Sequence, residues 1–108
     1  MEIKIQSLHF TANKQLEEFV QQKVEKLSHL NSQIILSDVC LKIDKAKKLN
    51  DKVCEIKLSL PGNDLFAKSQ RTTFEEAINE TTDGLLQQLK KRKTKLSPIK
   101  KQFNPANS

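Results

Sequence analysis

The residues with the clearest chemical potential form a run of cations late in the sequence. The stretch LLQQLKKRKTKL, residues 85–96, places five cations within six positions, at Lys90, Lys91, Arg92, Lys93 and Lys95. Such a run is typical of a surface that meets a polyanion. Lysines in the last turns of a helix can also simply complement its dipole, for about 0.3–1 kcal/mol, and many charge runs are only solvated.

Helical geometry argues against the solvated alternative. On a helical wheel, Arg92 falls inside the apolar stripe of Leu85, Leu89 and Leu96, and the four lysines fall on the remaining sides. A helix docked along its whole length keeps its charges on the outer side. A helix end charged all round is therefore expected to project beyond its own sheet, with an anionic partner offsetting the repulsion among its cations. The run predicts contact with nucleic acid.

The distribution of charge supports a polyanionic partner. The net charge is +6, but residues 1–84 contain 12 basic and 13 acidic residues, whereas residues 85–108 contain seven basic residues and no acid. An almost neutral body with a cationic end is a pattern found in proteins that bind nucleic acid.

Two further groups of lysines could extend this surface. Lys45, Lys47 and Lys48 lie in a polar segment between two expected strands, where the alternative is a solvated loop. Lys23 and Lys26 lie on an expected helix, and Lys23 falls inside its apolar stripe. Lys23 is expected either to run its stem along the core edge or to face the same partner.

The amino-acid composition favours folded RNA as the partner. The chain has five Phe and no Trp or Tyr, and Phe19 and Phe74 fit a core better than a platform for stacking bases. Lysine outnumbers arginine 17 to 2, which gives little support to bidentate reading of bases. A surface of this kind binds phosphates and shape.

No other chemistry is indicated. His9 and His29 have no cysteine or carboxylate at metal-ligand spacing, and Cys40 and Cys54 are expected to be small core residues. The chain has no glycine-rich phosphate loop and no nucleophile elbow. We therefore expect no enzyme, metal or cofactor. The absence of a signal sequence, of a membrane-length apolar run and of more than two cysteines predicts a cytoplasmic protein.

The elements that position these lysines follow from hydrophobic periodicity. Alternation predicts strands over residues 2–8, 34–43, 53–60 and 64–70, and in the last of these either Leu65 and Ala67 or Phe66 faces the core. A helix begins after Asn13 and ends at Asn31. A capping box, in the register of Thr72 or of Thr73, opens a second helix that continues to residue 96.

These elements predict an α+β fold in the order β-α-β-β-β-α, with two helices packed on one face of a four-stranded sheet. The first two strands would be joined by a right-handed crossover if they pair in parallel. We expect one domain over residues 1–96, followed by a flexible basic tail over residues 97–108.

The sequence resembles the ribosome hibernation-promoting factor family, also called the ribosome-associated inhibitor or sigma-54 modulation family. The resemblance covers residues 1–96 and rests on three motifs, which are LEEFVQQKVEKL from Leu16, VCLKIDK from Val39 and AINETTDGLLQQLKKRKTKL from Ala77. The sequence departs from the family pattern at a few positions that affect helix packing or capping, namely Thr72, Phe74, Asn79 and Thr81.

The resemblance implies a fold similar to double-stranded-RNA-binding domains and a partner, the small ribosomal subunit. Members of the family bind the channel between head and body, cover the decoding region and exclude mRNA and tRNA. Lys91, Lys93 and Lys95 match basic positions of the family's last helix, Arg92 stands where a basic residue or His is common, and Lys23 and Lys26 match first-helix lysines. The alternatives are a general double-stranded-RNA-binding module and a protein-interaction domain for an acidic partner.

Overall fold

The elements follow one another in the predicted order. The computed structural model describes residues 1–96, with side chains through Lys91. The elements are β1 (Glu2–Leu8), α1 (Lys14–Leu30), β2 (Leu36–Ile43), β3 (Lys52–Ser59), β4 (Leu65–Arg71) and α2 (Phe74–Leu96). The predicted β-α-β-β-β-α order is therefore confirmed, whereas the expected tail lies outside the described residues.

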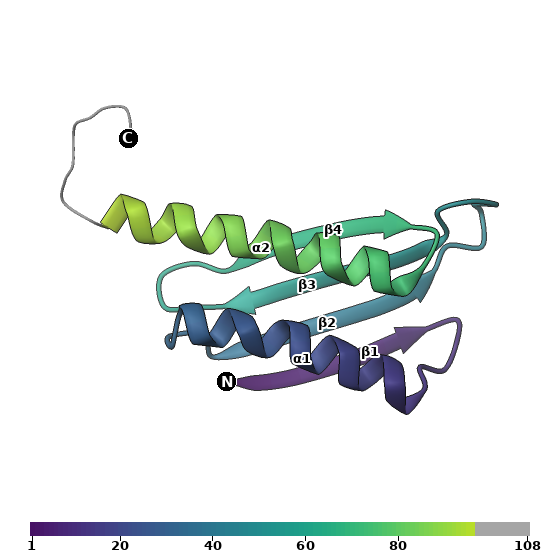
Figure 1. The fold of residues 1–108 in the computed structure, drawn as a ribbon, viewed down its shortest axis with the longest axis horizontal. Helices are drawn as coiled ribbons and strands as arrows, with labels where there is room; N and C mark the ends of the chain where they lie inside the picture. The colour runs from purple at the N-terminus through teal and green to yellow at the C-terminus, as the bar shows by residue number, and fades with distance from the viewer. Residues whose placement is uncertain (97–108) are drawn as a thin grey trace.

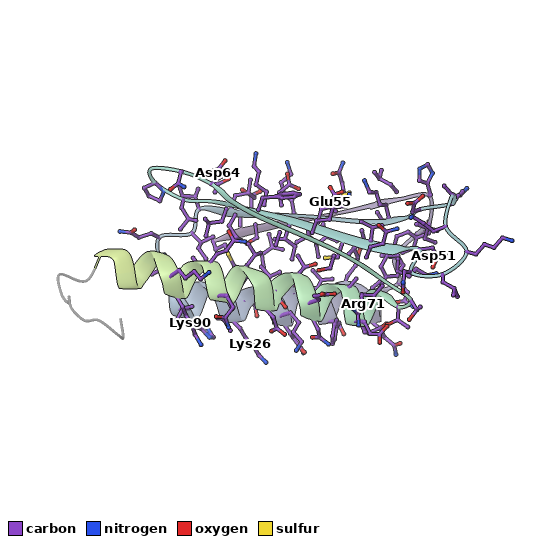
Figure 2. All side chains as sticks on the ribbon, turned by 90° about the horizontal axis from the view of Figure 1, so that it is seen from above. Lys26, Asp51, Glu55, Asp64, Arg71 and Lys90 are labelled. Carbon is purple, nitrogen blue, oxygen red and sulfur yellow. The ribbon has the colours of Figure 1, made fainter. Side chains whose placement is uncertain are left out.

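The four strands form one sheet in the order β1-β2-β3-β4 (Figure 1). β1 and β2 pair in parallel, so α1 is the crossover between them, and the other two pairs are antiparallel. Both helices lie on one side of the sheet, and the other face is open (Figure 2). The α+β fold class predicted from the sequence is confirmed.

The core lies between the sheet and the two helices. β2 and β3 contribute alternate residues to it, among them Val39, Leu41, Ile56 and Leu58, all 0% exposed. The helices contribute residues at helical spacing, namely Val20, Val24, Leu27, Ala77, Ile78, Leu85 and Leu89. Each strand buries every second residue, and each helix buries residues spaced three or four apart. A chain with many charged residues can therefore still form a continuous core.

The strand alternation corrects one sequence expectation and decides another. Cys54 is buried, but Cys40 is only half-buried, because it alternates with Val39 and Leu41 and so lies on the open face. The expectation that both cysteines are core residues is therefore wrong for Cys40. In β4, Leu65 and Ala67 pack against the core, whereas Phe66 is 53% exposed.

Both helices begin at side-chain caps. The Leu16 N–H donates to the Asn13 side chain at 2.8 Å, as the sequence predicts. At α2, the Glu76 N–H donates to Thr73 Oγ1 at 3.2 Å, and the Ala77 N–H donates to the Thr73 carbonyl at 3.1 Å. Of the two registers considered for the capping box, the structure therefore adopts the one that starts at Thr73.

Two threonines in the middle of α2 are buried, and hydrogen bonds offset the cost of burying their hydroxyl groups. The Thr81 hydroxyl donates to the Ala77 carbonyl at 2.7 Å and lies 3.3 Å from the Cys54 carbonyl of β3. The Thr82 hydroxyl donates to the Ile78 carbonyl at 2.9 Å. These bonds let polar side chains occupy core positions, so the helix passes through this region uninterrupted.

Candidate nucleic-acid interface

The basic end of α2 projects beyond the sheet, as the sequence predicts (Figure 1). Lys90 and Lys91 are exposed there. Arg92, Lys93 and Lys95 belong to the last turns of the helix, where the structure describes the backbone alone. Their role in binding stays a prediction from the sequence.

The two lysines of α1 differ in their surroundings. Lys26 is exposed, whereas Lys23 is half-buried and its Nζ lies 5.6 Å from the centroid of the Phe19 ring. Phe19 packs against the core, so the Lys23 stem runs along the core edge, which was one of the two alternatives for this residue. Lys26 is thus the lysine of α1 that is most available to a partner.

The topology brings the α1 lysines and the end of α2 together. α1 leads into the start of β2, and α2 leaves from the end of β4. β2 and β4 both run antiparallel to β3, so the two helices run in the same direction. Their C-terminal halves therefore lie at the same end of the molecule, where Figure 2 labels Lys26 and Lys90 on the helix side.

The helix layer is polarised in charge along its length. Its N-terminal halves carry six exposed carboxylates, Glu17, Glu18, Glu75, Glu76, Glu80 and Asp83. Among the described side chains, the C-terminal halves carry the cations except for Lys14 at the start of α1, and Glu25 is the one carboxylate in those halves. Acids near helix starts and bases near helix ends complement the two dipoles, so the polarity stabilises the helices as well as marking one end for an anionic partner.

The loop lysines do not extend this surface. Lys45, Lys47 and Lys48 are exposed in the link between β2 and β3, which lies at the end of the molecule opposite to the end of α2 (Figure 1). The ten predicted residues therefore form two groups, one at each end. The structure also identifies Leu49 as a candidate binding residue, which the charge pattern alone does not. Leu49 lies beside these lysines and is 74% exposed. An aliphatic residue within a polar, lysine-rich segment is the signal that could have identified it.

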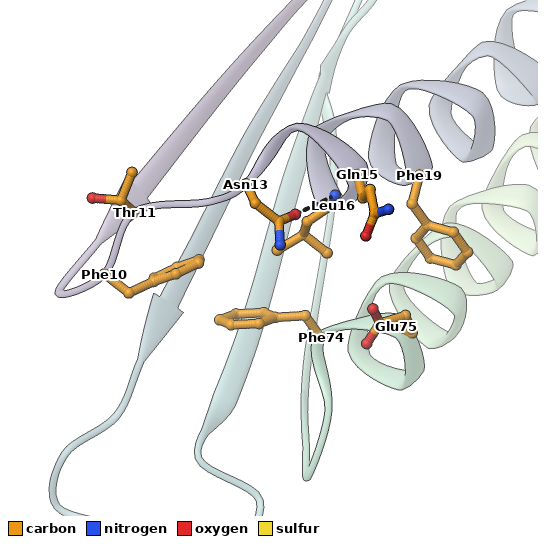
Figure 3. Close-up of a pocket in the computed structure, with 8 residues that line it drawn as sticks. All are labelled: Phe10, Thr11, Asn13, Gln15, Leu16, Phe19, Phe74 and Glu75. Carbon is orange, nitrogen blue, oxygen red and sulfur yellow. Dashed lines mark hydrogen bonds between the residues drawn. The ribbon is translucent and has the colours of Figure 1, made fainter.

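A hollow of about 410 Å³ lies between the starts of the two helices (Figure 3). The rings of Phe10 and Phe74 stack there with centroids 4.6 Å apart, and Leu16 and Phe19 line it beside them. Glu75 is its only titratable lining residue, so this hollow offers no acid–base pair. The stacked rings pack the segment before α1 against the start of α2.

Within residues 1–96, no group of three or more His, Cys, Asp or Glu residues is placed to hold a metal ion. Neither helix in this range is long and apolar enough to cross a membrane.

Two solved structures are similar to this chain in fold. A ribosomal subunit interface protein from Coxiella burnetii superposes with a TM-score of 0.77 at 20% identity, over 86% of this chain and 98% of that one. The N-terminal domain of Protein Y from Thermus thermophilus gives a TM-score of 0.74 at 20% identity, over 85% and 99%. At this identity the likeness shows the fold. No curated protein matches the sequence.

The family comparison covers nearly the whole described domain. The model of the sigma 54 modulation protein / S30EA ribosomal protein family matches residues 3–97. The match includes every strand, both helices and the basic end of α2. The chain belongs to this ribosome-associated family.

Proposed function

We propose that the protein is a hibernation factor that binds the small ribosomal subunit at the decoding channel and blocks mRNA and tRNA sterically. The observation that carries the proposal is that Lys26 and Lys90 lie at one end of two parallel helices (Figure 2). Exposed Lys91 follows Lys90 directly, and α2 projects past the sheet (Figure 1). A projecting rod with cations can enter an RNA-lined channel and meet phosphates on several sides.

Two comparisons support a position on the ribosome. Family membership indicates ribosome association, and the Coxiella burnetii relative in fold is described as a subunit interface protein. In our proposal, ribosomal RNA is the direct contact, with Arg92, Lys93 and Lys95 extending the cationic surface along α2 and Lys23 supporting it from α1. The action is steric, so it needs no cofactor and no chemical step.

Co-sedimentation with purified small ribosomal subunits on a sucrose gradient tests the contact. The test variant reverses three charges, Lys26→Glu, Lys90→Glu and Lys91→Glu. The matched control reverses three exposed lysines elsewhere, Lys4→Glu, Lys14→Glu and Lys57→Glu, and so has the same net charge. We expect the native chain and the control to travel with the subunit and the test variant to stay at the top. Equal binding by both variants would show that the helix ends are not the contact.

A competition experiment tests the decoding channel. Subunits are first loaded with mRNA and tRNA, and the native chain is then added. We expect loading to exclude the chain from the subunit, since both need the same space. Equal binding to loaded and empty subunits would refute the channel position and leave ribosome association at another site.

A further inference from the structure

Hydrogen bonds hold the link between β2 and β3 in place. The Asp44 N–H donates to the Asp51 carbonyl at 2.8 Å, and the Asp44 carbonyl accepts from the Lys47 N–H at 3.1 Å. The Asp44 carboxylate accepts from the Ala46 N–H at 3.1 Å and from the Gln70 side chain of β4 at 3.2 Å. These four bonds hold the loop to the end of the sheet, so its outer residues are presented in a defined arrangement.

The loop presents cations around an exposed apolar residue. Leu49 is 74% exposed, more than Ile35 at 61% or Phe66 at 53%, the next most exposed large hydrophobic residues of the described chain. Lys45, Lys47 and Lys48 are exposed beside it. The segment from Asp44 to Lys52 contains four lysines and two aspartates, so its cations are in excess. Asp51 pairs with Lys52 at 2.8 Å, and Asp44 holds the loop together.

No ion pair involves these three lysines in the part of the chain with described side chains. The neighbouring sheet lysines differ from them. Glu55 contacts both Lys42, at 3.0 Å, and Lys68, at 3.7 Å, and its hydrogen bond raises the pKa of Lys42. Charge on the open face is thus balanced, whereas charge in the loop is in excess and faces outward.

We propose that the loop is a second RNA-binding element, in which Lys45, Lys47 and Lys48 bind phosphates and Leu49 packs on riboses and base edges of a shallow minor groove. An A-form groove offers phosphates along both sides of such an apolar floor, which matches cations around one leucine. The inference rests on the proposed function. It adds a contact at the end of the molecule opposite to the C-terminal end of α2 (Figure 1).

Two contacts at opposite ends have a mechanical consequence. When one end is bound, the other is held near its own RNA segment at high effective concentration, so the two contacts reinforce each other. They also fix the orientation of the long axis of the protein, which a single basic end would leave free to pivot. A factor that blocks a channel sterically benefits from both effects.

Short-range cross-linking tests the second contact directly. An azidophenacyl group is attached to Leu49→Cys, to Lys91→Cys or, as control, to Phe66→Cys on the open face. All three are made with Cys40→Ser, and Cys54 is fully buried and does not compete for the reagent. On small subunits we expect Leu49→Cys and Lys91→Cys to cross-link to different segments of ribosomal RNA and Phe66→Cys to give little product.

The outcomes separate this inference from the proposed function. Cross-linking to RNA from Lys91→Cys alone would overturn the loop contact and keep the helix contact. Products between Leu49→Cys and a ribosomal protein, without RNA, would make an acidic protein surface the loop's partner and overturn the inference. Loss of RNA products from both positions would overturn both proposals.

Binding measurements give a second, independent readout. Lys45→Gln, Lys47→Gln and Lys48→Gln together should lower the slope of log affinity against log salt by about two to three, at about 0.7–0.9 per phosphate contact. Leu49→Ala should weaken binding about threefold to tenfold with an unchanged slope, because the lost contact is apolar. Phe66→Ala should change neither. An unchanged affinity for Leu49→Ala would exclude the groove contact.

Discussion

Lys26 of α1 and Lys90 of α2 lie on the helix side of the molecule and at the same end of it, although 64 positions separate them in the sequence. Their proximity to one end follows from the parallel course of the helices, which the parallel pairing of β1 with β2 and the antiparallel meander after it impose. An antiparallel helix pair would have placed the α1 lysines beside the carboxylates of α2. The sheet topology therefore creates the basic end.

Salt dependence should report how many of these lysines meet phosphates. Lys26→Gln and Lys90→Gln should each lower the log–log salt slope of subunit binding by about 0.7–0.9, and the double variant should lower it by the sum. The affinities of the variants and the native chain should converge at high salt. Filter binding between 50 and 300 mM salt measures this (about the range in which counterion release dominates). A slope that is the same in all four proteins would mean that neither lysine neutralises a phosphate.

The cap of α2 should depend on Thr73 rather than on Thr72. Thr73→Ala removes the acceptor for the Glu76 N–H and should lower the free energy of unfolding by about 1 kcal/mol. Thr72→Ala removes only a hydroxyl that donates to the exposed Glu76 carboxylate and should cost less than half as much. Urea unfolding followed by circular dichroism compares the two. Thr73→Ser serves as control and should retain nearly full stability, and a larger loss from Thr72→Ala would assign the cap to the other register.

The two cysteines should differ in reactivity and in their effect at high pH. Burial raises the pKa of the Cys54 thiol to about 12, from an ordinary value of 9.0. Burial also raises the pKa of Cys40, but this thiol is only half-buried on the open face. A thiol reagent at neutral pH should therefore modify Cys40 and spare Cys54 until the protein unfolds.

The raised pKa of Cys54 links stability to alkaline pH. Between pH 9.0 and about 12 the folded protein keeps the thiol proton that the unfolded chain has lost. Stability from this group is complete below pH 9 and falls as the pH rises toward 12. The melting temperature of the native chain, compared with that of Cys54→Ala at the same pH, should fall across that window. A constant difference between the two from pH 8 to 11 would show that the thiol titrates alike in both states.

Much of the fold was predictable because the local signals agree. The alternation of Val39 and Leu41, the spacing of Val20, Val24 and Leu27, and the cap at Asn13 each specify an element without reference to the others. Cys40 shows the limit of this reasoning. Its residue type suits a core, but its position in the alternation places it outside, and position prevails because every second residue of a strand shares a face.

The candidate site was less predictable than the fold. The run at Lys90 and Lys91 identifies a basic helix end from spacing alone, but no local signal tells whether Lys26 lies near it or whether Lys48 does. Both are lysines in polar surroundings, and only the strand order places the first at the same end as α2 and the second at the opposite end. Charge likewise gives no reason to consider Leu49, whose exposure depends on how Asp44 holds the loop.

Gly84 should be replaceable by alanine with a gain in stability. It lies in the middle of α2, where glycine costs about 1 kcal/mol relative to alanine through the entropy of the unfolded chain. An added Cβ would lie 3.8 Å from the Ala67 Cβ of β4, an ordinary van der Waals contact, so the substitution needs no adjustment of the helix. We expect Gly84→Ala to raise the free energy of unfolding by about 0.5–1 kcal/mol, measured by urea unfolding.

Gly62 provides the matched control for Gly84→Ala. Its φ of 99° lies in a region that residues with a side chain rarely adopt, so Gly62→Ala should destabilise the turn between β3 and β4. Opposite signs for the two substitutions would show that backbone conformation, rather than glycine content, decides the outcome. Destabilisation by Gly84→Ala would instead mean that α2 and β4 pack too closely for one more methyl group. Subunit binding by Gly84→Ala should be unchanged, since Lys26, Lys90 and Lys91 keep their positions on the two helices.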